Sequence, residues 1–343
     1  MEKLKELIKA FTSYPGVTGN EFMALDGLSE YIGSLGVFDE TGKTELGSFY
    51  GIIRCGKKDA KLLLCDAHID TVGCVVSEIC EGGFLKVSNV GGIAAKILSS
   101  AKVNIYGKKT LRGVFASKPP HLQTAGESEK KLEIPDMLID TGLSKEELEK
   151  YVRVGTPVGF SAEMTDLANN IVVGASFDDR LCGAVVVRAL MDIDRKNLDC
   201  DIAFQFSSGE ETDGRGAITT AYRLNPDYAI VLDVTHAFVK GAPKYLECTK
   251  AGEGCDLCYS PQTNRAFTKK AALLAEKNSI PVQFSACPRS TGTNSNDIQT
   301  LRSGIPTVLI SVPLKNMHTM SEIVDLRDAV AAARLVKAIA EDM

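Results

Sequence analysis

The sequence contains no tryptophan, and aromatic residues make up only 6% of its 343 residues. Sugar-binding clefts commonly stack their ligands on aromatic side chains, so this shortage disfavours a glycosidase. No apolar stretch approaches the roughly 18 residues that a membrane-spanning helix requires, and the longest run lies near residues 306–314. We therefore expect a chain that does not span a bilayer.

Neither sign of charge is in large excess, because 39 basic residues stand against 44 acidic ones and give a net charge of -5. A binder of nucleic acid or anionic membranes needs a concentrated positive surface, and no block of Lys and Arg provides one. The first residues alternate charged with apolar side chains and lack the apolar centre of a secretory signal. These features predict a cytoplasmic protein without a nucleic-acid or membrane partner.

Cofactor motifs are also scarce. The ten cysteines are scattered, which favours reduced, mostly buried thiols over a disulfide framework. Cys255 and Cys258 form a CxxC without the second pair that a zinc knuckle needs, so we expect two ordinary thiols in a loop. Residues 42–44 read GKT, but Val37 stands where a P-loop requires glycine, and no G-x-G-x-x-G follows a predicted strand. Nucleotide binding therefore has little support.

Hydrophobic periodicity predicts an α/β domain. Apolar residues from Leu4 to Phe11 recur at helical spacing and stop before Pro15, while Thr18 and Glu21 have the spacing of a capping box that opens a second helix. Strand-like runs follow, and beyond about residue 165 such runs alternate with helical patterns, as at 201–206, 228–233 and 307–312. This alternation indicates a mostly parallel central sheet flanked by helices.

A segment with a different pattern of apolar and polar residues separates the two parts of this domain. Residues 73–164 contain short strand candidates divided by turns, a polar stretch at 124–131 that predicts a mobile loop, and one helix that starts at Ser144 with Glu147 completing its capping box. We predict two domains: an α/β domain of residues 1–72 and 165–343, and a small β-rich domain of residues 73–164 inserted into it.

Histidines and carboxylates gather where predicted strands end. The carboxyl ends of parallel strands form the edge at which α/β proteins bind ligands, so these residues are expected to converge in one crevice. They are His68, Asp70, Asp178, Glu210, Glu211, Asp233 and His318.

Two histidines with several carboxylates match a two-metal site better than a structural thiolate site. A bridging carboxylate holds two divalent cations roughly 3.5 to 4 Å apart, and such a pair activates a shared water for attack on a carbonyl. A further carboxylate that is not a ligand can take the proton of that water. Glu210 and Glu211 suit this division, because neighbouring residues on an extended segment point in different directions.

Each of these residues has a simpler interpretation when taken alone. Asp178 could cap a helix, the glutamate pair could lie in a solvated loop, His68 could be a hydrogen-bonded core residue, and His318 could be merely exposed. The coincidence of two of only four histidines with acidic residues at one edge of a sheet favours the metal site. His121 and His236 lack evident acidic partners, and we expect both in loops.

Five motifs, in order along essentially the whole chain, resemble those of the tetrahedral aminopeptidase family, also labelled glutamyl aminopeptidases and sometimes cellulase-like endoglucanases. DAHIDTVG resembles the family's DAHxDEIG, and SFDDR, GEETDGRGA, LDVTHA and KNMHT resemble its other four motifs. The resemblance implies a dinuclear zinc peptidase-like catalytic domain interrupted by a barrel-like domain that serves dimerisation and oligomerisation. It also implies a homo-oligomer built from dimers, up to a tetrahedral dodecamer.

The resemblance further implies the role of each site residue. Asp178 would bridge two divalent metal ions per subunit, with zinc the first expectation and cobalt or manganese the alternatives. His68 and Asp233 would complete one metal site, and Glu211 and His318 the other. Catalytic roles would fall to Glu210, as general base, and to Asp70, which would orient His68.

Several residues beside the motifs depart from the family pattern, namely Thr71, Asp213, Asn294 and Asn316. No proposed metal ligand is lost, so the leading hypothesis is a metal-dependent aminopeptidase that removes N-terminal residues from short peptides. The alternatives are a dinuclear-metal amidohydrolase acting on non-peptide acyl groups, a glycosidase or endoglucanase, and a non-catalytic binding protein with a vestigial site.

Overall fold

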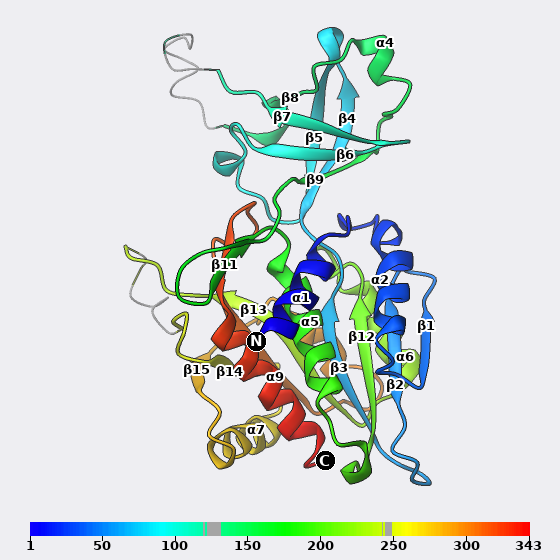
Figure 1. The fold of residues 1–343 in the computed structure, drawn as a ribbon, viewed down its shortest axis with the longest axis vertical. Helices are drawn as coiled ribbons and strands as arrows, with labels where there is room; N and C mark the ends of the chain where they lie inside the picture. The colour runs from blue at the N-terminus through cyan, green and yellow to red at the C-terminus, as the bar shows by residue number, and fades with distance from the viewer. Residues whose placement is uncertain (119–120, 122–131, 242, 244–248) are drawn as a thin grey trace.

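The computed structural model describes residues 1–118, 121, 132–241, 243 and 249–343, so the predicted loop at 124–131 lies outside the described residues. Within them, the chain forms a large sheet covered by helices and a separate closed barrel, which stands above the sheet in Figure 1. The predicted α/β fold with a barrel-like insertion is confirmed.

The large sheet contains eleven strands of the described chain, in the order β1-β2-β12-β3-β13-β16-β17-β11-β10, with β14 and β15 joined beside β16. Its central strands β12, β3, β13 and β16 are parallel, whereas β1, β2, β17, β11 and β10 pair antiparallel at the two sides. The strands are β1 (Glu40–Lys43), β2 (Phe49–Ile53), β3 (Leu62–His68), β10 (Thr165–Asp166), β11 (Ile171–Gly174), β12 (Asp201–Ser207), β13 (Tyr228–His236), β14 (Cys255–Tyr259), β15 (Val282–Ala286), β16 (Thr307–Lys315) and β17 (Glu322–Asp325).

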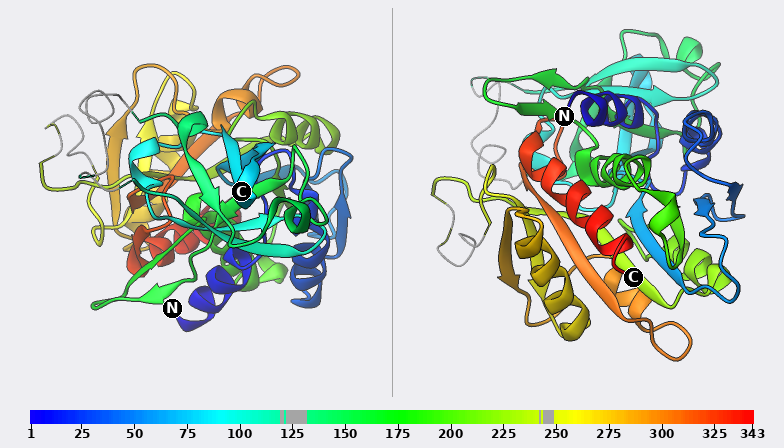
Figure 2. Two further views of the ribbon diagram at one scale, coloured as in Figure 1. Left: turned by 90° about the horizontal axis from the view of Figure 1, so that it is seen from above. Right: turned by 60° about the horizontal axis from the view of Figure 1, so that its bottom comes forward.

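Helices cover both faces of this sheet. Helices α1, α5 and α9 lie side by side on one face, and α6 and α8 pack on the other (Figures 1 and 2). No helix of the described chain is long and apolar enough to cross a membrane. The helices are α1 (Glu2–Thr12), α2 (Phe22–Ser34), α4 (Lys145–Leu148), α5 (Phe177–Met191), α6 (Arg215–Leu224), α7 (Arg265–Lys277), α8 (Ser295–Gln299) and α9 (Leu326–Ala340).

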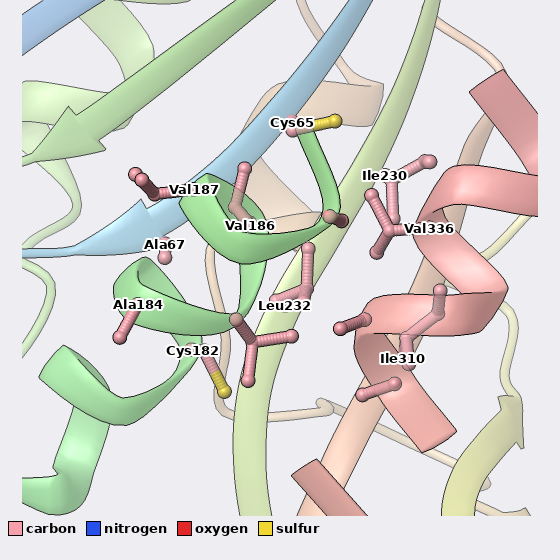
Figure 3. Close-up of a cluster of buried hydrophobic side chains, with 14 of the residues drawn as sticks. Cys65, Ala67, Cys182, Ala184, Val186, Val187, Ile230, Leu232, Ile310 and Val336 are labelled. Carbon is pink, nitrogen blue, oxygen red and sulfur yellow. The ribbon is translucent and has the colours of Figure 1, made fainter. Parts of the chain in front are cut away.

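The main core lies between helices α5 and α9 and the central strands. Figure 3 shows Cys65 of β3 and Cys182 of α5 among small aliphatic side chains there, and both thiols are free and buried. Burial raises the pKa of each thiol, so both remain protonated at neutral pH. Cys255 and Cys258 are also buried, but they lie in β14. The prediction that this pair occupies a loop is wrong, because the residues around it form strand β14, which pairs with β16.

The barrel has a hydrophobic core of its own and closes in the order β4-β5-β8-β7-β6-β9. Figure 2 shows it from above in its left view. The predicted capping box of Ser144 and Glu147 is present, and the helix that it opens, α4, is a single turn. The domain limits at residues 73 and 164 stay a prediction. The strands are β4 (Gly73–Ile79), β5 (Phe84–Val90), β6 (Lys102–Tyr106), β7 (Thr110–Phe115), β8 (Leu138–Asp140) and β9 (Pro157–Phe160).

The capping box predicted at the start of α2 does not form. The Thr18 hydroxyl instead donates a hydrogen bond to Asp70 Oδ2 at 2.8 Å, and Glu21 accepts from the Gly19 amide at 3.0 Å. A bridge between Val17 and the strand end near Asp70 brings Thr18 there. A contact between residues 52 positions apart thus replaces a local one, and it links α2 to the predicted site.

Candidate metal centre

His68 is the last residue of β3, and its ring faces the start of α5. Its Nε2 lies 3.0 Å from Asp178 Oδ1, and its Nδ1 lies 3.0 Å from the main-chain oxygen of Asp70. The side chain is only 2% exposed. With Nδ1 engaged by a carbonyl oxygen, the Nε2 atom is left to bind a cation.

Asp178 lies between two imidazoles. Its Oδ2 is 3.1 Å from His318 Nε2, while its Oδ1 contacts His68. The φ and ψ angles of Asp178 and Asp179 are not helical, so regular helix begins after them, and no side-chain cap bond is present at the N-cap residue Ser176. The simpler interpretation of Asp178 as a helix cap therefore does not hold.

Two groups of donor atoms share Asp178. The inner group contains His68, Asp178 and Asp233, the outer group contains Asp178, Glu211 and His318, and the donor atoms within each group lie within 4.8 Å of one another. Glu211 Oε1 is 3.3 Å from His318 Nε2. One carboxylate shared by two histidine-containing groups has the donor chemistry of a site for two divalent cations.

Glu210 belongs to neither group. Its Oε2 lies 3.8 Å from His68 Nε2, and it lines the same cavity as the outer group. The Asp70 carboxylate accepts hydrogen bonds from the amides of Glu210 at 3.1 Å and Glu211 at 3.3 Å. Asp70 therefore holds the glutamate pair, while its carboxylate is 3.6 Å from the His68 ring, farther than its main-chain oxygen.

The buried ionisable groups of this cluster shift one another's pKa values. Burial favours neutral His68, but Asp178 and neighbouring carboxylates outweigh it and raise the pKa of His68 well above its usual range. The same competition raises the pKa of His318 to about 11. Burial raises the pKa of Glu210 to about 8, and that of Asp233 well above its usual range. Carboxylates outnumber imidazoles in this largely buried cluster, so the residues fit bound cations.

A cavity of about 600 Å³ opens onto the cluster. Its wall includes Asp178, Glu211, Asp233 and His318 as well as Glu210, whereas His68 and Asp70 are buried behind it. The described residues that line it include no Phe, Tyr or Trp, the side chains on which sugars commonly stack. A second cavity of about 410 Å³, between the end of α1 and the barrel, contains none of the predicted site residues.

Sequence reasoning missed Glu322. This buried residue of β17 accepts hydrogen bonds from the amides of Phe177 at 2.7 Å, Asp178 at 3.3 Å and His318 at 2.9 Å. It thereby holds the shared carboxylate and an outer ligand in one arrangement. The signal in the sequence was weak, since it amounts to one acidic residue in a short strand four residues after His318.

Other site features differ from expectation or were not predicted. Asp233 does not end its strand, because β13 continues to His236, which pairs with β16 and lines the cavity instead of lying in a loop. Asp179 Oδ2 accepts from the His68 amide at 3.2 Å. His318 Nδ1 lies 2.8 Å from the main-chain oxygen of Gly92, a residue that follows barrel strand β5. The outer group thus depends on a segment from the predicted inserted domain.

Three comparisons with known proteins show which proteins this chain resembles. A model of the M42 glutamyl aminopeptidase family matches residues 47–335. The lysyl aminopeptidase of Pyrococcus furiosus is 30% identical over 342 residues, which cover 98% of this chain and 97% of that relative.

Two solved structures are similar over nearly the whole chain. A TET aminopeptidase from a marine sediment thaumarchaeon has a TM-score of 0.93 at 30% identity, covering 100% of this chain and 97% of that one. The TET1 peptidase of Pyrococcus horikoshii, described as assembling into a tetrahedron or a large octahedral shell, has a TM-score of 0.83 at 26% identity, covering 98% of this chain and 99% of that one.

Proposed function

The chain belongs to the M42 glutamyl aminopeptidase family, and from this premise we propose that it removes N-terminal residues from short peptides in the cavity beside the two donor groups. Aminopeptidase activity is the property of the family. The finer proposal is that this chain uses two divalent metal ions and Glu210. The observation that carries it is the position of Asp178 between His68 and His318, with Glu210 outside both donor groups.

The proposed ligands follow the two groups. His68 and Asp233 would hold one cation, Glu211 and His318 the other, and Asp178 both. When bound, divalent cations lower the pKa of water and polarise a carbonyl oxygen. Zinc suits imidazole and carboxylate donors, and cobalt and manganese are alternatives.

Glu210 is the proposed general base. It would accept a proton from the attacking water and return it to the amine that leaves when the first peptide bond breaks. Asp70 acts through Glu210 by accepting its main-chain amide, and the same carboxylate is held by the Thr18 hydroxyl. These contacts keep the base at a constant position beside the inner group.

Cleavage of chromogenic aminoacyl amides and short peptides tests the proposal. We expect activity that disappears on chelation and returns with zinc, cobalt or manganese. Glu210→Gln should lower kcat by about 10² to 10⁴-fold with metal content unchanged, whereas Glu276→Gln, a change of an exposed carboxylate on α7, should have no effect. Cleavage that survives chelation would exclude the metal mechanism. Binding of two metal equivalents without peptide cleavage would direct attention to non-peptide acyl amides.

We also propose a homo-oligomer built from dimers, up to a tetrahedral dodecamer. The support is the assembly described for the Pyrococcus horikoshii relative, together with apolar Val114 and Val154, which are 40% and 69% exposed on the barrel segment. Light scattering coupled to size-exclusion chromatography should give a mass many times 36.8 kDa. A monomer mass would contradict this proposal.

A further inference from the structure

Two cysteines lie together at the carboxyl ends of strands β14 and β15, which run side by side in parallel (Figure 1). Cys258 pairs with Ser285 in this ladder, and Cys287 is two residues farther along the chain. The ladder continues to Cys287, whose amide donates a hydrogen bond to the main-chain oxygen of Tyr259 at 3.0 Å. The thiols of Cys258 and Cys287 are hydrogen-bonded to each other, and both cysteines are free. Two reduced thiols in contact are the starting arrangement for a disulfide.

The two thiols differ in their access to solvent. Cys258 is 2% exposed, and burial raises the pKa of its thiol to about 12, so it is protonated at neutral pH. Cys287 follows the last residue of β15 and is partly exposed. A small disulfide in solution can therefore reach Cys287 first, with Cys258 placed behind it to complete the exchange.

A buried carboxylate lies beside this pair. Ser285 is hydrogen-bonded to the Cys258 thiol, and its hydroxyl donates to Asp256 Oδ2 at 2.6 Å. Asp256 is 1% exposed, its Oδ1 has no hydrogen-bond partner, and no described residue forms an ion pair with it. Burial raises the pKa of Asp256 to about 6, which makes this carboxylate a stronger base than an exposed aspartate. Asp256 has no part in the metal centre, and through Ser285 it can accept the proton that Cys258 must release.

The two strand ends continue into one wall of the active-site cavity. Residues 290–294, 296 and 297 line that cavity, and Cys287 is three residues before this segment. The loop after β14 holds the segment in place, since Ser260 Oγ donates to the main-chain oxygen of Arg289 at 3.4 Å and Gln262 Oε1 accepts from the Thr291 amide at 2.8 Å. A change in the separation of β14 and β15 therefore moves this wall relative to the metal centre.

From this arrangement we propose that Cys258 and Cys287 are a reversible modification site, at which a low-molecular-weight disulfide oxidises the pair and thereby weakens substrate binding in the cavity. The Cys287 thiolate attacks one sulfur of the small disulfide and releases one small thiol. Cys258 then gives its proton to Asp256 through Ser285 and attacks the Cys287 sulfur, so that the second small thiol leaves. The two protein thiols lose two electrons and two protons, and the small disulfide gains both and becomes two thiols.

The new bond would change the shape of the cavity wall. A disulfide holds its sulfurs about 2 Å apart, closer than two thiols in contact, and it fixes the torsion about the bond. Its formation draws the end of β15 towards β14 and shifts the segment that follows Cys287. Displacements of about 1 Å in a binding site lower turnover by up to about 10²-fold. The effect on the substrate rests on the proposed peptidase function, whereas the disulfide itself does not.

The first test follows the bond without using activity. Metal-loaded protein is incubated with oxidised glutathione and digested with its free thiols blocked, and mass spectrometry then identifies linked peptides. We expect the peptides of Cys258 and Cys287 to be joined in a fraction that rises with the ratio of oxidised to reduced glutathione and disappears in excess reduced glutathione. Cys65 and Cys182, which are fully buried, should stay unmodified. Asp256→Asn should form the link more slowly.

The second test measures the cavity wall after small thiols have been removed by gel filtration. Oxidised protein should have a KM for short peptides about three- to tenfold higher than reduced protein, with metal content unchanged. Cys287→Ser should keep the KM of reduced protein and should not respond to the oxidant. Its activity shows that the variant is folded. Cys80→Ser removes a partly buried thiol from the barrel segment and should respond as the wild type does.

Absence of the link between Cys258 and Cys287 at every glutathione ratio, or an unchanged KM in fully linked protein, would overturn the inference and leave the peptidase proposal intact. A link that forms in Asp256→Asn at the wild-type rate would exclude Asp256 as the proton acceptor. Failure of both forms to cleave any peptide or amide would overturn the peptidase proposal and the weakened substrate binding with it, while the linked peptides would still decide the disulfide.

Discussion

The inner and outer donor groups share Asp178 but are built differently. The inner residues come from strands β3 and β13 of the parallel sheet, and the His68 side chain is only 2% exposed. The outer histidine follows strand β16 and is 28% exposed. His318 also depends on contacts outside the parallel strands, with Gly92 after a barrel strand and with Glu322 on β17. The parallel strands position the two residues that belong to the inner group alone, His68 and Asp233, whereas His318 of the outer group is held by two further segments.

This difference predicts unequal metal binding. Ligands on rigid, buried strands are already ordered, so they lose less conformational entropy when a cation binds than ligands on a partly exposed loop do. We expect the inner group to keep its metal longer during dialysis, and the outer group to respond to changes in distant segments.

The largest effect should come from the histidines. His68→Ala should remove metal from the inner group and lower activity at least 10³-fold, beyond the roughly 10 to 100-fold cost of losing a residue that only supports a ligand. His318→Ala should retain about one metal equivalent after dialysis. Metal analysis with activity assays measures both, and His121→Ala, an exposed residue outside the cavity, is the control. Greater metal loss in His318→Ala than in His68→Ala would reverse the comparison.

Chelation should make stability depend on pH. Burial raises the pKa of Glu210 and of Glu322 to about 8, above the ordinary glutamate value of about 4.5. Each group thus contributes stability that is complete below pH 4.5 and lost as the pH rises through 8. The raised pKa of His318 acts in the same direction above pH 6.5.

The free energy of unfolding of the chelated protein should therefore fall by at least about 2 kcal/mol between pH 5 and pH 8. Urea denaturation at a series of pH values measures this change. Metal-saturated protein serves as the control and should show a smaller slope, because bound cations compensate the carboxylates. Equal slopes with and without metal would argue against cation binding in this cluster.

Glu322→Gln tests the link between the groups. The two oxygens of Glu322 accept hydrogen bonds from the main-chain amides of Asp178 and His318. In the glutamine variant an NH₂ group replaces one of these oxygens and faces a main-chain N–H, so we expect Asp178 and His318 to shift. Activity should fall about 10 to 100-fold, with loss of metal from the outer group first. Metal titration and activity assays measure these changes. Unchanged metal affinity and unchanged activity would show that Glu322 does not position the ligands.

Gly92→Ala should have the smallest effect and act on the outer group alone. The new Cβ would lie 3.3 Å from His318 Nδ1, a distance that forces the ring to move by a few tenths of an ångström. We expect about a threefold loss of activity with metal in the inner group unchanged. Gly33→Ala in α2 is a matched control, since nothing lies within 4 Å of its Cβ. Equal effects of the two variants would remove Gly92 from this role.

Prediction from the sequence succeeded where the signal is local. The apolar runs that became β3, β12, β13 and β16 were recognisable by length and composition, and the residues at their carboxyl ends could be expected at one edge. It failed where a partner far along the chain competes, as when Thr18 bonds Asp70 instead of capping α2. The extension of β13 to His236 likewise depends on pairing with β16.

The sequence by itself determined the alternation of strands and helices and the residue types of the candidate site, because hydrophobic period and strand ends are properties of neighbouring residues. Only the tertiary structure decided which carboxylate is shared and that Glu322 holds the main chain of that residue. These arrangements join segments more than a hundred residues apart. They are set by strand pairing and packing rather than by local propensity.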